Sequence, residues 1–207
     1  MLALIAGSGD LPAVILNARR DVYVCAMAGF APDVPVDLTF RIEQLGTFLA
    51  HLKGLGVSEV CFAGAVKRPV IDPAAVDAAT MPLVPMIKEA IARGDDGALR
   101  AVIAIFETAG FVVRAAHDLV PQLLPVAGVP SRCRPDAAMM AQAVLGEQAL
   151  VDLGQRDIGQ ACVVQTGELL AQEGPDGTDA MIAGVRTDGG ILFKGPKPDQ
   201  DRRADLP

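Results

Sequence analysis

The chain has 207 residues, enough for one large domain or two small ones. Apolar residues make up 51% of it and charged residues 21%, which allows a sizeable core and argues against wholesale disorder. The formal net charge of −7 disfavours nonspecific nucleic-acid binding, because no diffuse positive charge is present to neutralise phosphates.

The N-terminal sequence and the cysteines indicate a cytoplasmic protein. The opening residues, MLALIAGSGD, have no basic segment before their apolar stretch, so they are predicted to form a first strand and not a signal peptide. No long apolar run lacks charges or Gly and Pro breaks, so no membrane span is indicated. No CxxC pair occurs, and we expect reduced, buried cysteines. The four are Cys25, Cys61, Cys133 and Cys162.

The first part of the chain alternates short apolar runs with helical spacing. This alternation predicts a parallel α/β sheet covered by helices on both faces. The expected strands are residues 2–6, 22–28, 57–63 and 111–114, and the expected helices are residues 11–19, 42–52, 86–93 and 99–108.

A proline-rich stretch divides the chain. Residues 121–135 contain four prolines and little periodicity, and we place a linker near residues 129–135. The second part mixes helix and strand and is small for a closed domain. Its expected elements are a helix at 136–153, a hairpin of 161–165 with 169–172, a short helix at 179–185 and a strand at 190–194.

Two turns in the first part could contact phosphate. Gly7-Ser8-Gly9-Asp10-Leu11-Pro12 joins a strand to a helix, the context of a phosphate-binding turn, and a purely structural tight turn fits it equally well. Pro12 departs from the dinucleotide fingerprint, and the second strand ends without an acidic residue, which counts against an NAD-linked oxidoreductase. Lys67 and Arg68 follow a strand, where they could clamp a diphosphate or form a solvated basic turn.

Most of the candidate catalytic residue types lie in the second part of the chain. Residues 157–160 precede a strand, residues 173–179 join a strand to a helix, and residues 194–205 mix carboxylates with lysines and arginines. Carboxylates can hold Mg²⁺ while cations neutralise a phosphoryl group, so the pattern suits metal-assisted phosphoanhydride hydrolysis. A solvated charged tail explains the last stretch as well.

Taken together, these segments resemble one family, the UDP-2,3-diacylglucosamine pyrophosphatases of the lipid A pathway that differ from the calcineurin-like phosphoesterases. The resemblance spans the whole chain in order and spacing. The similar stretches are IAGSGDLP (5–12), GAVKRP (64–69), RGDDGALR (93–100), DIGQACVV (157–164), AQEGPDGTDAM (171–181) and KGPKPDQDRRADLP (194–207).

The resemblance implies a Rossmann-like N-terminal domain, residues 1–130, and a smaller α+β catalytic domain, residues 131–207. It implies Mg²⁺-dependent hydrolysis of UDP-2,3-diacylglucosamine to UMP and 2,3-diacylglucosamine 1-phosphate. It also implies a cytoplasmic protein bound peripherally to the inner membrane. Family chains continue past the final DLP, so we expect the second domain to be truncated, with apolar surface that could support a homodimer. A noncatalytic module that binds nucleotide or lipid phosphate is the alternative.

The resemblance also assigns roles to individual residues. The metal-binding or catalytic carboxylates are Asp201 and Asp205, and the phosphate-neutralising cations are Lys194, Lys197 and Arg203. The substrate-binding candidates are Gly7, Ser8, Gly9, Leu11, Pro12, Lys67, Arg68, Gln160, Gly177, Thr178 and Asp179. Gly174-Pro175-Asp176 stands where relatives carry an acidic residue followed by Glu-Gly.

Overall fold

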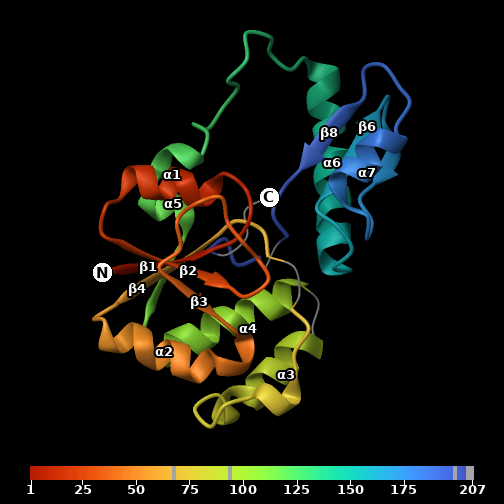
Figure 1. Ribbon diagram of the computed structural model, residues 1–207. Helices are drawn as coiled ribbons and strands as arrows, with labels where there is room; N and C mark the ends of the chain where they lie inside the picture. Colours follow the sequence, from red (N-terminus) through yellow and green to blue (C-terminus); the bar gives the residue numbers. More distant parts are fainter. Residues whose placement is uncertain (67–68, 93–94, 198–199, 204–207) are drawn as a thin grey trace. The chain divides into compact units, whose positions relative to one another are not determined.

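The computed structural model describes residues 1–66, 69–92, 95–197 and 200–203. They form two compact units (Figure 1). The first comprises Met1–Pro125 and also Asp201 to Arg203, and the second comprises Val126–Gln200. A segment near the C-terminus therefore packs with the first unit.

The first unit is built on a parallel five-stranded sheet. Its strands are β1 (Leu2–Ala6), β2 (Val22–Met27), β3 (Leu38–Phe40), β4 (Glu59–Ala63) and β5 (Val112–Arg114), in the order β3-β2-β1-β4-β5. This is the order of doubly wound nucleotide-binding sheets. The α/β class predicted for this part is confirmed, although the short strand β3 was not foreseen.

Helices cover both faces of this sheet (Figure 1). Alternate residues of β1 face opposite cores, as the two-residue period of a strand requires. Ala3 and Ile5 pack with one group of helices, and Leu2 and Leu4 pack with another. The α-helices are α1 (Leu11–Ala18), α2 (Leu45–Gly54), α3 (Val84–Ala92), α4 (Asp95–Thr108) and α5 (Ala116–Leu119). Short 3₁₀ turns lie at Ile42–Gln44, Pro73–Ala75, Met81–Leu83 and Pro121–Leu123.

The second unit packs a long helix on a small antiparallel sheet. The helix α6 (Ala137–Gln155) begins at Asp136, whose carboxylate accepts a hydrogen bond from the N–H of Met139 at 2.8 Å and so caps the helix. The remaining elements are β6 (Ala161–Gln165), β7 (Glu168–Gln172), α7 (Gly177–Gly184) and β8 (Ile191–Lys194), with strand order β7-β6-β8. The predicted hairpin is therefore correct.

The two faces of β6 bury different residues. Cys162 and Val164 pack against Leu153 of α6, and Val163 packs against Met181 of α7. Strand β7 lies at the edge of the sheet, and most of its residues are exposed. Within the described ranges, no helix is both long enough and apolar enough to cross a membrane.

Candidate functional site

The glycine turn after β1 is joined to the turn after β4. The N–H of Gly7 donates to the carbonyl of Ala63 at 2.8 Å, and Ser8 and Ala65 exchange backbone hydrogen bonds of 3.0 and 2.9 Å. A side chain at Gly7 would collide with the backbone of Ala65, so this crossing requires glycine. Two N–H groups of the predicted phosphate-binding turn are thus already engaged in holding the turns together.

The rest of this turn divides into buried and exposed parts. Pro12 is fully buried in the first turn of α1, and Leu11 packs against the core beside β1. Ser8 and Gly9 are exposed. Any ligand contact at this turn would therefore come from the backbone or from the Ser8 hydroxyl, which at present donates to the carbonyl of Ala65 at 3.2 Å. Lys67 and Arg68, the predicted clamp, lie outside the described residues.

A small cavity of about 260 Å³ lies at the carboxyl ends of β2 and β3. Glu43 in its wall is 3% exposed and accepts hydrogen bonds from Arg41 at 3.1 and 3.2 Å and from the N–H of Asp72 at 2.9 Å. The bonds from Arg41 are the main reason that the pKa of Glu43 falls to about 2. This buried, fully bonded carboxylate fastens the segment after β4 to the start of α2.

Residues 201–203, near the end of the chain, belong to the first unit. Arg203 donates to both carboxylate oxygens of Asp201, at 2.7 to 3.3 Å, and also contacts Glu107 of α4. The hydrogen bonds from Arg203 hold the pKa of Asp201 below its ordinary value and raise that of Arg203. Asp201 is therefore a carboxylate at neutral pH, and Arg203 fixes its direction.

The second unit brings together three of the predicted residues. Lys194 at the end of β8 donates to the hydroxyl of Thr178 at 3.0 Å, and Thr178 in turn donates to Glu173 at 2.6 Å. The second oxygen of Glu173 accepts the backbone N–H of Gln160 at 2.6 Å. Segments 157–160, 173–179 and 194–197, which are far apart in the sequence, therefore meet in one polar cluster.

Lys197 and Asp157 complete this cluster. The Lys197 ammonium lies 2.5 Å from a carboxylate oxygen of Asp157, and the Lys197 side chain is only 20% exposed. Asp157 adopts a left-handed backbone conformation, with φ of 53°, which places it at a tight turn after α6. Lys194, in contrast, contacts a hydroxyl and keeps its positive charge available for a ligand.

The remaining candidates differ in their surroundings. Gly177 has φ of 85° and introduces α7, whereas Asp179 is exposed on that helix. The side-chain oxygen of Gln160 is buried, and within the described ranges no donor reaches it. Asp205 lies outside the described residues.

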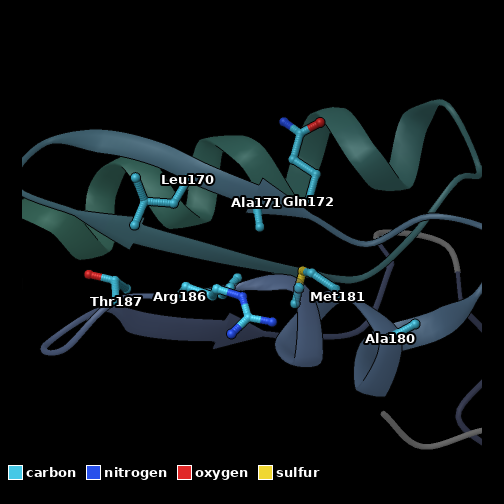
Figure 2. A pocket seen from close by; sticks show the side chains of 9 residues that line it. Leu170, Ala171, Gln172, Ala180, Met181, Arg186 and Thr187 are labelled. Atoms are coloured by element: carbon cyan, nitrogen blue, oxygen red, sulfur yellow. The ribbon is translucent and has the colours of Figure 1, made fainter.

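A shallow groove of about 450 Å³ lies in the same unit (Figure 2). In Figure 2, Leu170 and Gln172 of β7 line one wall, and Met181 and Arg186 lie on the other. The mixture of an aliphatic wall with a guanidinium suits a ligand that is partly apolar and partly anionic.

No preassembled metal centre occurs among the residues that the structure describes, since no three His, Cys, Asp or Glu side chains converge there. Mg²⁺ in phosphate chemistry commonly uses one or two carboxylates, with waters and substrate oxygens as the other ligands. Asp201 can supply one such carboxylate because it is ionised, and in this structure both of its oxygens accept hydrogen bonds from Arg203.

These features define a two-domain α/β protein whose second domain carries a polar cluster with two lysines and two carboxylates. Comparison with known proteins gives the family. Residues 1–123 match the LpxI N-terminal domain and residues 126–207 match the LpxI C-terminal domain. The chain belongs to the LpxI family.

One curated relative is the UDP-2,3-diacylglucosamine pyrophosphatase LpxI of Caulobacter vibrioides. It is 34% identical over an alignment of 225 residues, which covers 100% of this chain and 80% of the relative. The family resemblance drawn from the six sequence stretches is therefore confirmed.

Sequence reasoning missed Glu173 as a member of the site. The residue was noted only as part of an acidic segment, although it accepts hydrogen bonds from two other motifs. The sequence carries no signal for this role, because residues 160 and 178 share Glu173 as a partner only in the folded chain. A Cβ at Gly159 would lie 2.8 Å from the Cβ of Glu173, so glycine permits the close approach.

Proposed function

We propose that this chain hydrolyses the pyrophosphate bond of UDP-2,3-diacylglucosamine and thereby serves lipid A biosynthesis. The observation that carries the proposal is the match of the chain, over its whole length, to a curated relative of that name. In the reaction a water oxygen bonds to one phosphorus, the bridging P–O bond breaks, and UMP and 2,3-diacylglucosamine 1-phosphate leave. Lys194, the exposed lysine of the polar cluster in the second unit, supports the same chemistry.

The chain's own cations have a clear role in this reaction. Negative charge moves onto the leaving phosphate as the bridging bond breaks, and fixed positive groups stabilise that charge more in the transition state than in the substrate. Lys194 has two N–H bonds left after donating to Thr178. We assign Lys194 to the substrate phosphates and Lys197, which is paired with Asp157, to a supporting position.

We further propose that Mg²⁺ is the cofactor and that Asp201 is one of its ligands, with Asp205 as the second candidate. When bound, the ion would neutralise oxygens of the pyrophosphate. The ionised state of Asp201 and the fit of a one-carboxylate site to Mg²⁺ support this assignment. Arg203 then has the task of orienting Asp201.

The substrate carries two acyl chains, so we propose that the protein acts at the cytoplasmic surface of the inner membrane and associates with it peripherally. Apolar side chains exposed on α6, among them Met139, Met140 and Val144, support contact with a lipid surface or a second copy of the chain. Flotation with phospholipid vesicles tests the first contact, and light scattering tests the homodimer.

The function is tested by UMP release from UDP-2,3-diacylglucosamine, measured with Mg²⁺ and with EDTA. The parent chain is compared with Lys194→Met and with Lys53→Met, a control that removes an exposed lysine of α2. We expect metal-dependent turnover that Lys194→Met reduces at least about tenfold and Lys53→Met leaves unchanged. A folded parent that retains the lipid product without turnover would instead support the noncatalytic binding module.

A further inference from the structure

The contacts of Glu173 form a directed chain of hydrogen bonds. Its Oε1 lies 2.6 Å from the hydroxyl of Thr178, and that hydroxyl lies 3.0 Å from the ammonium of Lys194. Its Oε2 lies 2.6 Å from the backbone nitrogen of Gln160. One carboxylate thus connects the strand before α7, the start of α7, the end of β8 and the turn before β6.

The direction of this chain follows from the number of hydrogens. An ammonium only donates, an ionised carboxylate only accepts, and a hydroxyl has a single hydrogen to give. Thr178 must therefore donate to Glu173 and accept from Lys194. This arrangement holds the Lys194 nitrogen at a fixed place and leaves two of its hydrogens for another partner.

Glu173 is suited to this task because it stays ionised. Burial raises its pKa, but hydrogen bonds from Thr178 and from the N–H of Gln160 lower it, with the positive charges of Lys194 and Lys197. The net effect is a pKa below the ordinary value of a glutamate. Asp157, the other carboxylate of the cluster, is paired with Lys197 and does not compete for Lys194.

We propose that Glu173 is a positioning residue for the pyrophosphatase: it orients the Thr178 hydroxyl and, through it, holds Lys194 at the substrate phosphates. This inference rests on the proposed function. It differs from a purely structural role, in which Glu173 would only fasten the loop before α7. A structural role predicts that stability and turnover fall together, whereas positioning predicts a loss of kcat in a folded protein.

Glu173→Gln separates the two roles because it keeps the shape of the side chain. The amide oxygen must face the N–H of Gln160, so the amide NH₂ faces Thr178 and forces its hydroxyl to accept. The hydroxyl hydrogen then turns away from residue 173, and Thr178 loses the charged acceptor that fixes its orientation toward Lys194. The contact between Thr178 and Lys194 is weakened in this way without a cavity or a new buried charge.

The experiment measures kcat and KM for UMP release with the full chain, in Glu173→Gln, Thr178→Val and the double variant. We expect each single variant to lower kcat about tenfold or more, with KM changed less. The double variant should be no worse than the poorer single variant, because both remove the same chain of contacts. Thr178→Ser should recover most of the activity that Thr178→Val loses. Glu168→Gln, in the neighbouring exposed part of β7, should match the parent.

A second readout does not depend on turnover. Acetic anhydride labelling followed by mass spectrometry measures how fast Lys194 reacts, with Lys53 as an internal reference. Release of Lys194 from Thr178 should make its labelling several-fold faster in Glu173→Gln and in Thr178→Val.

The outcomes separate the two proposals. An active parent with unchanged kcat in both single variants, or with fully multiplicative effects in the double variant, would overturn the positioning role alone. A folded but inactive parent would overturn the proposed function and with it this role, whatever the labelling shows. Loss of folding in Glu173→Gln leaves the uncharged pair Thr178→Val and Thr178→Ser to decide.

Discussion

The two units of this protein handle their polar groups differently. In the first unit the buried carboxylate of Glu43 is bonded to Arg41 and to a backbone N–H, in the wall of the small cavity at the ends of β2 and β3. In the second unit Glu173 is only half-buried, and it ends a chain of donors that begins at the exposed Lys194. The first arrangement fastens loops, and the second leaves a positive group free to bind.

The difference extends to the cores. Phe106 in the first unit meets Phe62 edge-on at 5.2 Å and Phe48 at 6.4 Å, within a large two-sided core. The second unit has a three-stranded sheet with a mostly exposed edge strand. Side chains such as Phe106 in the first unit are deeply buried, whereas the polar cluster of the second unit is partly exposed, and exposed polar pairs contribute little to stability. Substitutions should therefore cost stability in the first unit and activity in the second.

The largest effect is expected from Phe106→Ala, which removes a 2%-exposed ring from the core of the first unit. We expect a loss of roughly 3–5 kcal/mol, because the cavity adds to the lost burial. Hydrogen–deuterium exchange should rise in β1 and β4 and stay near the parent value in β6. Val112→Ala, at a 52%-exposed position of β5, is the control and should cost below about 1 kcal/mol. If hydrogen–deuterium exchange rose equally in β6, the two units would unfold as one.

The next effect concerns pH. The pKa of Glu43 in the folded protein is about 2, against an ordinary value of 4.5. The ionised carboxylate therefore stabilises the fold fully at pH values above about 4.5. That contribution is lost as the pH falls from about 4.5 towards about 2. Glu43→Gln should be less stable by roughly 2 kcal/mol at pH 7, because a charged hydrogen-bond acceptor is lost. Urea unfolding from pH 7 to pH 3 should show a weaker pH dependence in this variant, while Asp33→Asn, at an exposed position, keeps that of the parent.

Much of the fold could be predicted from the sequence because the signals were local. The alternation of apolar runs and helical spacing gave four of the five parallel strands, and the turn at Thr166-Gly167 gave the hairpin of β6 and β7. Strand β3 has three residues, too few to show a period. Its position depends on pairing with β2, which the sequence does not display.

The residues of the site were predicted better than the hydrogen bonds that join them. The charged C-terminal run singled out Lys194 and Lys197, the family resemblance assigned a role to Thr178, and the fold brings all three into one cluster. Hydrogen bonds between distant segments have no sequence period, so the links from Glu173 to residues 160 and 178 could not be read in advance. The place of Pro12 in the first turn of α1 fits local helix chemistry, whereas the pairing of Ser8 with Ala65 required the neighbouring strand.

Lys197→Met should reduce stability less than the two preceding substitutions, but it should reduce activity strongly. The pair with Asp157 joins a 20%-exposed lysine to a 48%-exposed carboxylate, and pairs of this kind contribute about 1 kcal/mol or less. If Lys197 supports the phosphate site, kcat for UMP release should fall about tenfold while the unfolding midpoint changes little. Lys53→Met is the matched control. Equal losses of stability and turnover would mean that the ion pair of Lys197 with Asp157 is structural. The second unit would then resemble the first in using its polar contacts for stability.

The smallest perturbation uses the cysteines as reporters of each unit. Cys25 and Cys61 are buried in the first unit and Cys162 in the second, and burial raises the pKa of Cys25 and of Cys61 to about 12. Cys133 is exposed, so the native chain should present one fast thiol to Ellman's reagent, and Cys133→Ser should remove it. In the Cys133→Ser background, Phe106→Ala should then expose Cys25 before Cys162, because only the first core has been weakened. Simultaneous reaction of both thiols would show that the two units unfold together. The different effects expected in the two units could then not be explained by independent folding.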